Sequence, residues 1–170
     1  VEECVSILKN ETSDDERVTR LMNETRELSL WLSAHMIHLG KASPTVNEAY
    51  FLAEEILESG KAFQKFEELC QIHGGRLGEL PKPKNKLSVV SDRDGFVQSF
   101  KTEDIGLAGI LLKAGRAKTN DIIEPTAGIE FHCKVGDSVK KGEPIFTLFG
   151  ADKSLFSAAE MKLKSSFVIG

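Results

Sequence analysis

Residues 91–148 read SDRDGFVQSFKTEDIGLAGILLKAGRAKTNDIIEPTAGIEFHCKVGDSVKKGEPIFTL, a stretch punctuated by glycines at irregular spacings. Glycine reaches positive φ without steric cost, so it is favoured where a chain turns sharply. Repeated turns between short apolar runs predict a compact module of short strands rather than a bundle of long helices. The same stretch contains no set of residues typical of catalysis.

The composition of the whole chain restricts the function classes to consider. Its 170 residues are 41% hydrophobic and 28% charged, which is typical of a globular protein of one or two domains. The formal net charge of −4 argues against nucleic acid as a partner, because phosphate backbones are bound by basic surfaces. No apolar run approaches the roughly 18 residues that would cross a bilayer, and no signal peptide is recognised, so we expect no membrane partner.

The cysteines and the first residues indicate the cellular context. Cys4, Cys70 and Cys133 are odd in number and form no CxxC pair, so we expect reduced thiols in a cytoplasmic protein. The chain opens on Val1, without an initiator methionine, inside an apolar pattern that suits a helix. We therefore expect it to be a piece of a longer polypeptide.

Residues 1–75 predict a helical segment. Ser13 and Glu16 have the spacing of a capping box, and the apolar residues that follow recur with a 3.6-residue period as far as Gly40. Ser43 followed by Pro44 predicts the start of the next helix, with serine as the cap. That helix and a third one are predicted to end at glycines.

Residues 76–86 predict a linker, because the polar PKPK run favours an extended chain. Residues 87–170 then predict a second domain, in which Leu87–Ser91 and Phe96–Phe100 flank Asp94-Gly95, a strong hairpin signal. Its remaining elements are a short helix capped by Thr102, strands at 129–134 and 145–149, a helix at 154–164 and a last strand at 167–169. The fold class is therefore predicted as α+β.

Several residues are candidates for chemistry or for the core. His35 and His38 have i, i+3 spacing on one helix, but no further ligand stands at a partner spacing, so we interpret both as structural. His132 and Cys133 are adjacent in a predicted strand and would point to opposite faces, which excludes a nucleophile–base pair. Seven residues are predicted to be core: Trp31, His35, Phe63, Phe66, Leu111, Phe131 and Phe146.

One alternative function is a covalent carrier domain. The run VGDSVKKGEPIFTL resembles the turn and strand of lipoyl and biotinyl carriers, and Lys153 and Lys162 stand in contexts similar to their modified lysine. Carrier lysines lie at the tip of a tight hairpin, whereas residues 154–164 have helical spacing. We therefore attribute the likeness to shared barrel-sandwich geometry and keep the carrier as an alternative.

A longer resemblance covers essentially the whole chain. The order and spacing of DGFV, TEDIGLAGILLKAGR, AGIEFH and KVGDSVKKGEPIFTL resemble the C-terminal region of the pyrimidine-nucleoside phosphorylases, whose best-known members are thymidine phosphorylases. The helical part, which opens with VEECVSILKN, is similar to that family as well. AMP phosphorylases share this architecture and are the nearest alternative.

The resemblance implies reversible phosphorolysis of thymidine or another pyrimidine nucleoside to free base and (deoxy)ribose 1-phosphate. In the family, the groups that bind phosphate and base precede the region that begins at Val1. No residue of this chain is therefore expected to be catalytic, and the chain alone is expected to be inactive. The family needs no cofactor, although its intact members can hold a structural potassium ion, for which Glu3 is the corresponding carboxylate.

The resemblance also implies an architecture. The helical segment would belong to the large α/β domain of the parent protein, and residues 87–170 would form an antiparallel hammerhead or barrel-sandwich-like module. The parent is expected to be a homodimer, which forms mainly through a helical domain that this chain lacks.

Overall fold

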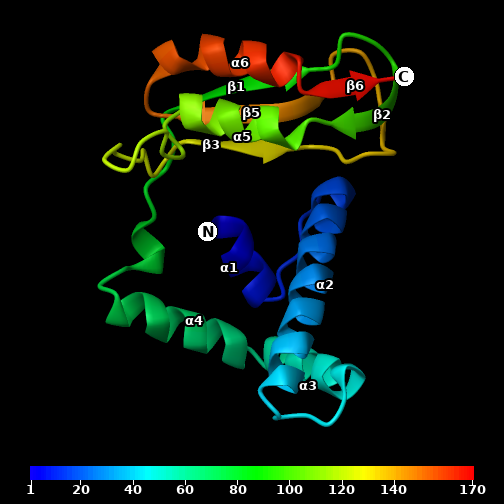
Figure 1. Cartoon of the computed structure of the whole chain (residues 1–170), viewed down its shortest axis with the longest axis vertical. Coiled ribbons are helices and arrows are strands. Elements are labelled where there is room, and N and C mark those ends of the chain that lie inside the picture. Colours follow the sequence, from blue (N-terminus) through cyan, green and yellow to red (C-terminus); the bar gives the residue numbers. More distant parts are fainter. The chain divides into compact units, whose positions relative to one another are not determined.

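The computed structural model describes residues 1–170 and divides them into two compact units, Val1–Leu80 and Pro81–Gly170 (Figure 1). Unit 1 is helical, and unit 2 combines antiparallel sheets with helices. The prediction of an α+β fold is therefore confirmed. The boundary between the units lies inside the 76–86 stretch that the sequence suggested as a linker.

Unit 1 consists of four α-helices and one 3₁₀ turn. The sequence prediction of helices up to about residue 73 is confirmed, and Gly40 follows directly on the last residue of the longest one. Gly60 adopts a left-handed φ of 77°, which explains why glycine separates two consecutive helices there. The elements are α1 (Glu2–Leu8), α2 (Glu16–Leu39), α3 (Val46–Glu58), α4 (Lys61–Ile72) and η1 (Leu77–Glu79).

Both helix caps predicted in unit 1 are wrong. Asp15, not Ser13, caps α2, because its carboxylate accepts the backbone N–H groups at the start of the helix while the Ser13 hydroxyl accepts Asp15 N–H. Thr45, not Ser43, caps α3 by accepting the N–H of Glu48. In both cases the residue adjacent to the first helical turn provides the cap, since a cap oxygen must reach N–H groups two or three residues on.

Unit 2 contains two three-stranded sheets in which all pairs are antiparallel. The first has the order β1 (Asn85–Val90), β5 (Pro144–Gly150), β3 (Gly128–Phe131). The second has the order β4 (Ser138–Val139), β2 (Gly95–Phe100), β6 (Phe167–Ile169). The strands predicted near 129–134, 145–149 and 167–169 are thus present.

The predicted hairpin at Asp94-Gly95 is wrong. Its two flanking strands are both present, but β1 pairs with β5 whereas β2 pairs with β4 and β6. Asp94 Oδ1 accepts the backbone N–H of Lys141 at 2.7 Å, and Gly95 lies so close to Gly170 that a Cβ would approach its carbonyl oxygen to 2.8 Å. The turn therefore carries the chain from one sheet to the other instead of folding it back.

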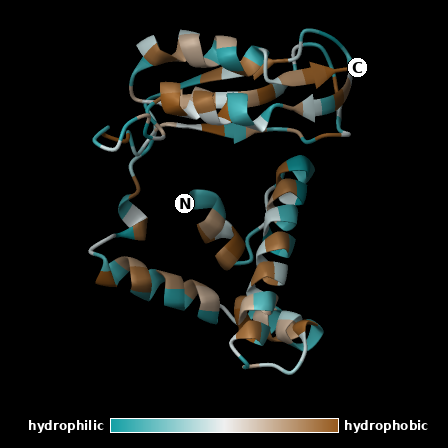
Figure 2. Ribbon diagram, viewed as in Figure 1, coloured by the Kyte–Doolittle hydropathy of each residue, from teal (hydrophilic) through white to brown (hydrophobic).

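The two sheets share one core with helices α5 (Thr102–Leu111) and α6 (Phe156–Lys164), which is preceded by the short η2 turn (Lys153–Leu155). The helix predicted at 102 begins there, but the predicted Thr102 cap is wrong, because Thr102 is the first helical residue and Lys101 before it is the N-cap. α5 and α6 pack against each other and are joined by an ion pair between Lys162 and Asp104 at 2.6 Å. In Figure 2 the strands of this unit carry many of the most hydrophobic residues of the chain.

The predicted core residues divide between the two units. Phe146 is fully buried, and Phe63 and Phe66 are half-buried. Four others are exposed: Trp31, His35, Leu111 and Phe131.

Each exposed residue has a local reason. Phe131 belongs to β3, an edge strand, and covers one side of Phe146 at a centroid distance of 5.0 Å. α5 buries Ile105 and Ala108, and Leu112, directly after the helix, is buried on the same i, i+3, i+7 face, whereas Leu111 lies off that face. Trp31 and His35 lie on sides of α2 that no other element of unit 1 covers completely.

Candidate functional site

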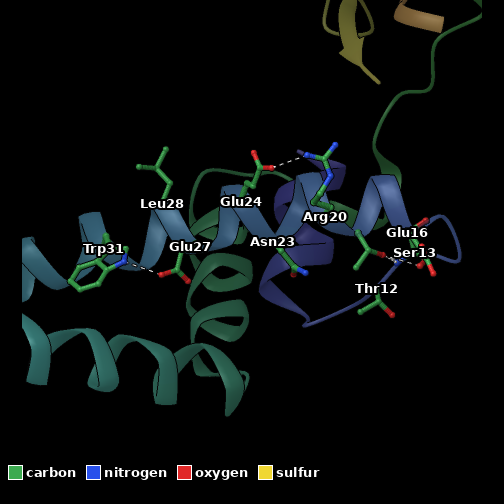
Figure 3. A pocket seen from close by; sticks show the side chains of 10 residues that line it. Thr12, Ser13, Glu16, Arg20, Asn23, Glu24, Glu27, Leu28 and Trp31 are labelled. Atoms are coloured by element: carbon green, nitrogen blue, oxygen red, sulfur yellow. Dashed lines mark hydrogen bonds and ion pairs between the residues drawn. The ribbon is translucent and has the colours of Figure 1, made fainter. Parts of the chain in front are cut away.

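A shallow groove lies in unit 1. It follows α2 over four turns and begins in the loop before that helix (Figure 3). Eight of its ten lining residues are polar or charged, and the two apolar ones, Leu28 and Trp31, lie at one end. The lining residues are Thr12, Ser13, Glu16, Thr19, Arg20, Asn23, Glu24, Glu27, Leu28 and Trp31.

A carboxylate bound by two aromatic residues closes the apolar end of the groove. Glu27 Oε1 accepts the indole N–H of Trp31 at 2.9 Å, and Glu27 Oε2 accepts the hydroxyl of Tyr50 at 2.9 Å. The two rings lie 4.7 Å apart. The hydrogen bond to Glu27 raises the pKa of Tyr50, because it stabilises the protonated phenol beside a negative charge. This cluster joins α2 to α3.

The charges of the groove do not suit a phosphate group. Three carboxylates line it, and its one cation, Arg20, is within 3.2 Å of Glu24. No serine or cysteine of the groove lies beside a histidine, so a nucleophile–base arrangement is absent from it. The chain as a whole contains no group of three or more His, Cys, Asp or Glu placed to hold a metal ion.

Glu3, the predicted cation ligand, is exposed on α1. Its Oε1 accepts the hydroxyl of Thr25 at 3.2 Å, which brings two oxygen atoms together. Hard cations such as Ca²⁺ are surrounded by roughly six to eight oxygens. The residues of this chain therefore do not form a cation site by themselves, and the role of Glu3 in an intact protein stays a prediction.

The histidines and the carrier-type lysines occupy ordinary structural positions. His132 Nε2 is hydrogen bonded to Thr147 Oγ1 at 2.7 Å, while Cys133 is fully buried. Lys162 lies in the last turn of α6 and is paired with Asp104, and Lys153 begins the η2 turn. Neither lysine stands at the tip of a hairpin.

The sequence did not reveal the Glu27 cluster. The i, i+4 spacing of Glu27 and Trp31 is visible in the sequence and is compatible with contact on a helix. Tyr50, however, comes 23 residues after Glu27 and reaches it only because α3 packs on α2. No local pattern encodes that contact.

Comparison with known proteins gives a consistent result along the chain. Residues 96–170 match the family model described as the pyrimidine nucleoside phosphorylase C-terminal domain. The pyrimidine-nucleoside phosphorylase of Bacillus subtilis (strain 168) is 35% identical over 155 residues, which is 88% of this chain and 34% of that protein. Residues 96–170 belong to the pyrimidine-nucleoside phosphorylase family.

Two further relatives agree with this assignment. The pyrimidine-nucleoside phosphorylase of Geobacillus stearothermophilus is 30% identical over 155 residues, covering 88% of the chain and 34% of the relative. That of Staphylococcus aureus (strain bovine RF122 / ET3-1) is 31% identical over 149 residues, covering 84% and 34%. The chain therefore spans about a third of the length of the curated phosphorylases that it matches.

The similarity to phosphorylases extends over both units. The matched C-terminal domain lies within unit 2, which is about half of the chain, so matches that cover 88% of the chain include most of unit 1. The glycine-rich stretch lies almost entirely within the domain match. None of the helices has the length and apolar character required to span a bilayer.

Proposed function

We propose that this chain is the C-terminal part of a pyrimidine-nucleoside phosphorylase. The whole protein would catalyse the reversible phosphorolysis of thymidine or a related pyrimidine nucleoside, giving the free base and (deoxy)ribose 1-phosphate. The observation that supports this proposal is the match over 88% of the chain to relatives that bear this name. Those relatives are about three times as long as the matched part.

The chemistry of phosphorolysis explains why the residues that bind phosphate and base are expected outside this chain. Phosphate has to be held by cationic and N–H donors, and the charge that develops on the leaving base must be stabilised by further donors. The groove on α2 carries three carboxylates, and its arginine is paired. We infer that this chain supplies scaffold and that the phosphate and base ligands lie in the other two thirds of the phosphorylase.

The other properties of the parent follow the same proposal. We propose a homodimer that uses no organic cofactor, with potassium as a structural ion and Glu3 as one of its ligands. Glu3 is exposed on α1, so oxygens from other segments could approach it.

A chimera tests the proposal. The part of the Bacillus subtilis relative that lies outside the match is fused to this chain, and thymidine and uridine are incubated with phosphate while the free base is quantified by chromatography. We expect turnover by the chimera and none by the 170-residue chain alone. A folded chimera without turnover, or turnover by the chain alone, would contradict the proposal.

A further inference from the structure

Unit 1 has a much smaller core than unit 2, although the two units have similar lengths. Helices α1 and α4 contribute no buried residue at all. A domain of this size ordinarily buries about 60% of the surface of its unfolded chain. Unit 2 has thirteen buried residues in one cluster, whereas the five buried hydrophobic residues of unit 1 are Leu30, Ala34, Ala49, Ala53 and Leu57.

Four strongly exposed apolar residues of unit 1 lie on one side of α2. Leu28, Leu32, Met36 and Leu39 are 62%, 57%, 73% and 79% exposed, and they follow one another at intervals of four, four and three residues. Residues at this spacing line one face of an α-helix. We call these four residues the α2 stripe.

The α2 stripe lies opposite the face that packs on α3. Successive residues of an α-helix are about 100° apart around its axis, because there are 3.6 residues per turn. The stripe therefore spans roughly a quarter of the helix circumference. The buried residues Leu30 and Ala34 lie on the opposite side. Figure 3 shows the difference for two labelled side chains, since Leu28 points away from the α3 side and Trp31 points toward it. α2 is thus apolar on two sides and covered on one.

We propose that the α2 stripe is the docking face for the part of a pyrimidine-nucleoside phosphorylase polypeptide that lies outside the third matched by this chain. This inference rests on the proposed function and names the partner of unit 1. The relatives contain a counterpart of most of unit 1 together with twice as much further polypeptide. The occupant would offer an apolar layer that completes the core on the free side of α2.

A second copy of this chain fits the stripe less well. Burial of one leucine-sized side chain stabilises an interface by about 1.5–3 kcal/mol. At about 25 cal/mol per Å², this free energy corresponds to roughly 60–120 Å² of apolar surface removed from water. Four such side chains on each of two copies would bury about 500–1,000 Å², below the roughly 1,200 Å² of a stable interface. The larger phosphorylase segment could also cover Phe51 of α3, which is 67% exposed.

Complementation between two polypeptides tests the docking face. The whole 170-residue chain is co-expressed with the remaining segment of the Bacillus subtilis relative, and co-purification through a tag on the chain is followed by a measurement of the dissociation constant. The test variant is Leu32→Glu/Met36→Glu, which places two charges on the stripe. Gln64→Glu/Gln71→Glu adds the same charge at two exposed positions of α4 and serves as the matched control. Far-UV circular dichroism verifies that both variants fold.

We expect the chain and the control to bind the segment, and the stripe variant to bind at least ten-fold more weakly. Equal binding by the stripe variant, or no co-purification of the segment with the original chain, would overturn the docking proposal. Self-association that the stripe variant abolishes, without capture of the segment, would assign the face to a second copy and overturn it as well. If the chain binds the segment but no phosphorolysis is seen, only the proposed function is refuted. If the chimera is active but the separate chain and segment do not bind each other, only the docking face is refuted.

Discussion

The aromatic core of unit 2 allows a stability prediction to be worked out in detail. Phe146 lies in the middle of β5 with no exposed surface. Its ring stands 5.6 Å from that of Phe100, 5.0 Å from Phe131 and 5.9 Å from Phe167. Substitution of Phe146 by alanine removes a side chain that fills the space between both sheets.

The expected cost follows from burial and from the ring contacts. A buried phenylalanine removes about 150–250 Å² from water, which is worth about 4–6 kcal/mol at 25 cal/mol per Å². Measured Phe→Ala changes in cores cost about 3–5 kcal/mol, because the remaining side chains relax only partly. We expect Phe146→Ala to lower the free energy of unfolding of unit 2 by about 4 kcal/mol. With an m-value of about 1.5 kcal/mol per M, the urea midpoint would fall by about 2–3 M.

Urea titrations of the whole chain measure this change. Far-UV circular dichroism follows both units, while fluorescence of Trp31, the single tryptophan, follows unit 1. Phe96→Ala is the matched control, because Phe96 is in the same unit but 56% exposed, and we expect it to cost less than about 1 kcal/mol. The reasoning is refuted if the two substitutions lower the stability of unit 2 equally. A shift of the Trp31 transition by the same amount would show that the units unfold together.

Three further predictions concern single groups. Gly95→Ala should destabilise unit 2 by about 1–3 kcal/mol, because the new Cβ would approach a backbone oxygen to 2.8 Å. Gly106→Ala is the control, since a Cβ at position 106 meets open space and should stabilise α5 slightly. Equal thermal midpoints for the two variants would contradict this prediction. Glu27→Gln should lower the pKa of Tyr50, the single tyrosine, which absorbance near 295 nm reports directly; an unchanged titration would exclude the hydrogen bond as the cause. The pKa of Asp152 is lowered by the serine hydroxyl two residues on, so this carboxylate contributes stability above its unfolded pKa of about 3.9 and loses it as the pH falls further. Asp152→Asn should therefore flatten the pH dependence of the urea midpoint below about pH 4, and parallel curves would contradict this.

The sequence predicted the elements better than it predicted their partners. Helical periodicity and glycine stops identify α2, α3 and α4, because these signals depend on residues within one element. Strand pairing depends on the whole unit. Asp94-Gly95 has the composition of a two-residue hairpin turn, yet its contacts with Lys141 and Gly170 lead β2 into the other sheet.

The candidate site shows the same division between local and distant information. The argument against a metal pair at His35 and a nucleophile–base pair at His132 needs only the spacing of these residues in the sequence. The cluster around Glu27 could not be predicted, because Tyr50 belongs to another helix. The resemblance to the phosphorylases was recognised from the order of many short motifs along the whole chain, and no single residue would have been sufficient.

The wrong core predictions in unit 1 give information about α2 itself. The 3.6-residue period was recognised from residues that lie on one face of the helix, whereas the structure buries the opposite face, with Leu30 and Ala34. A helix with apolar residues on two opposite sides is typical of the interior of a larger domain, not of a surface. The exposure of Leu32 and Met36 therefore conflicts with the sequence only if unit 1 is complete. A layer on the free face of α2 would bury both, and the prediction that Trp31 belongs to a core could then hold in the assembled phosphorylase.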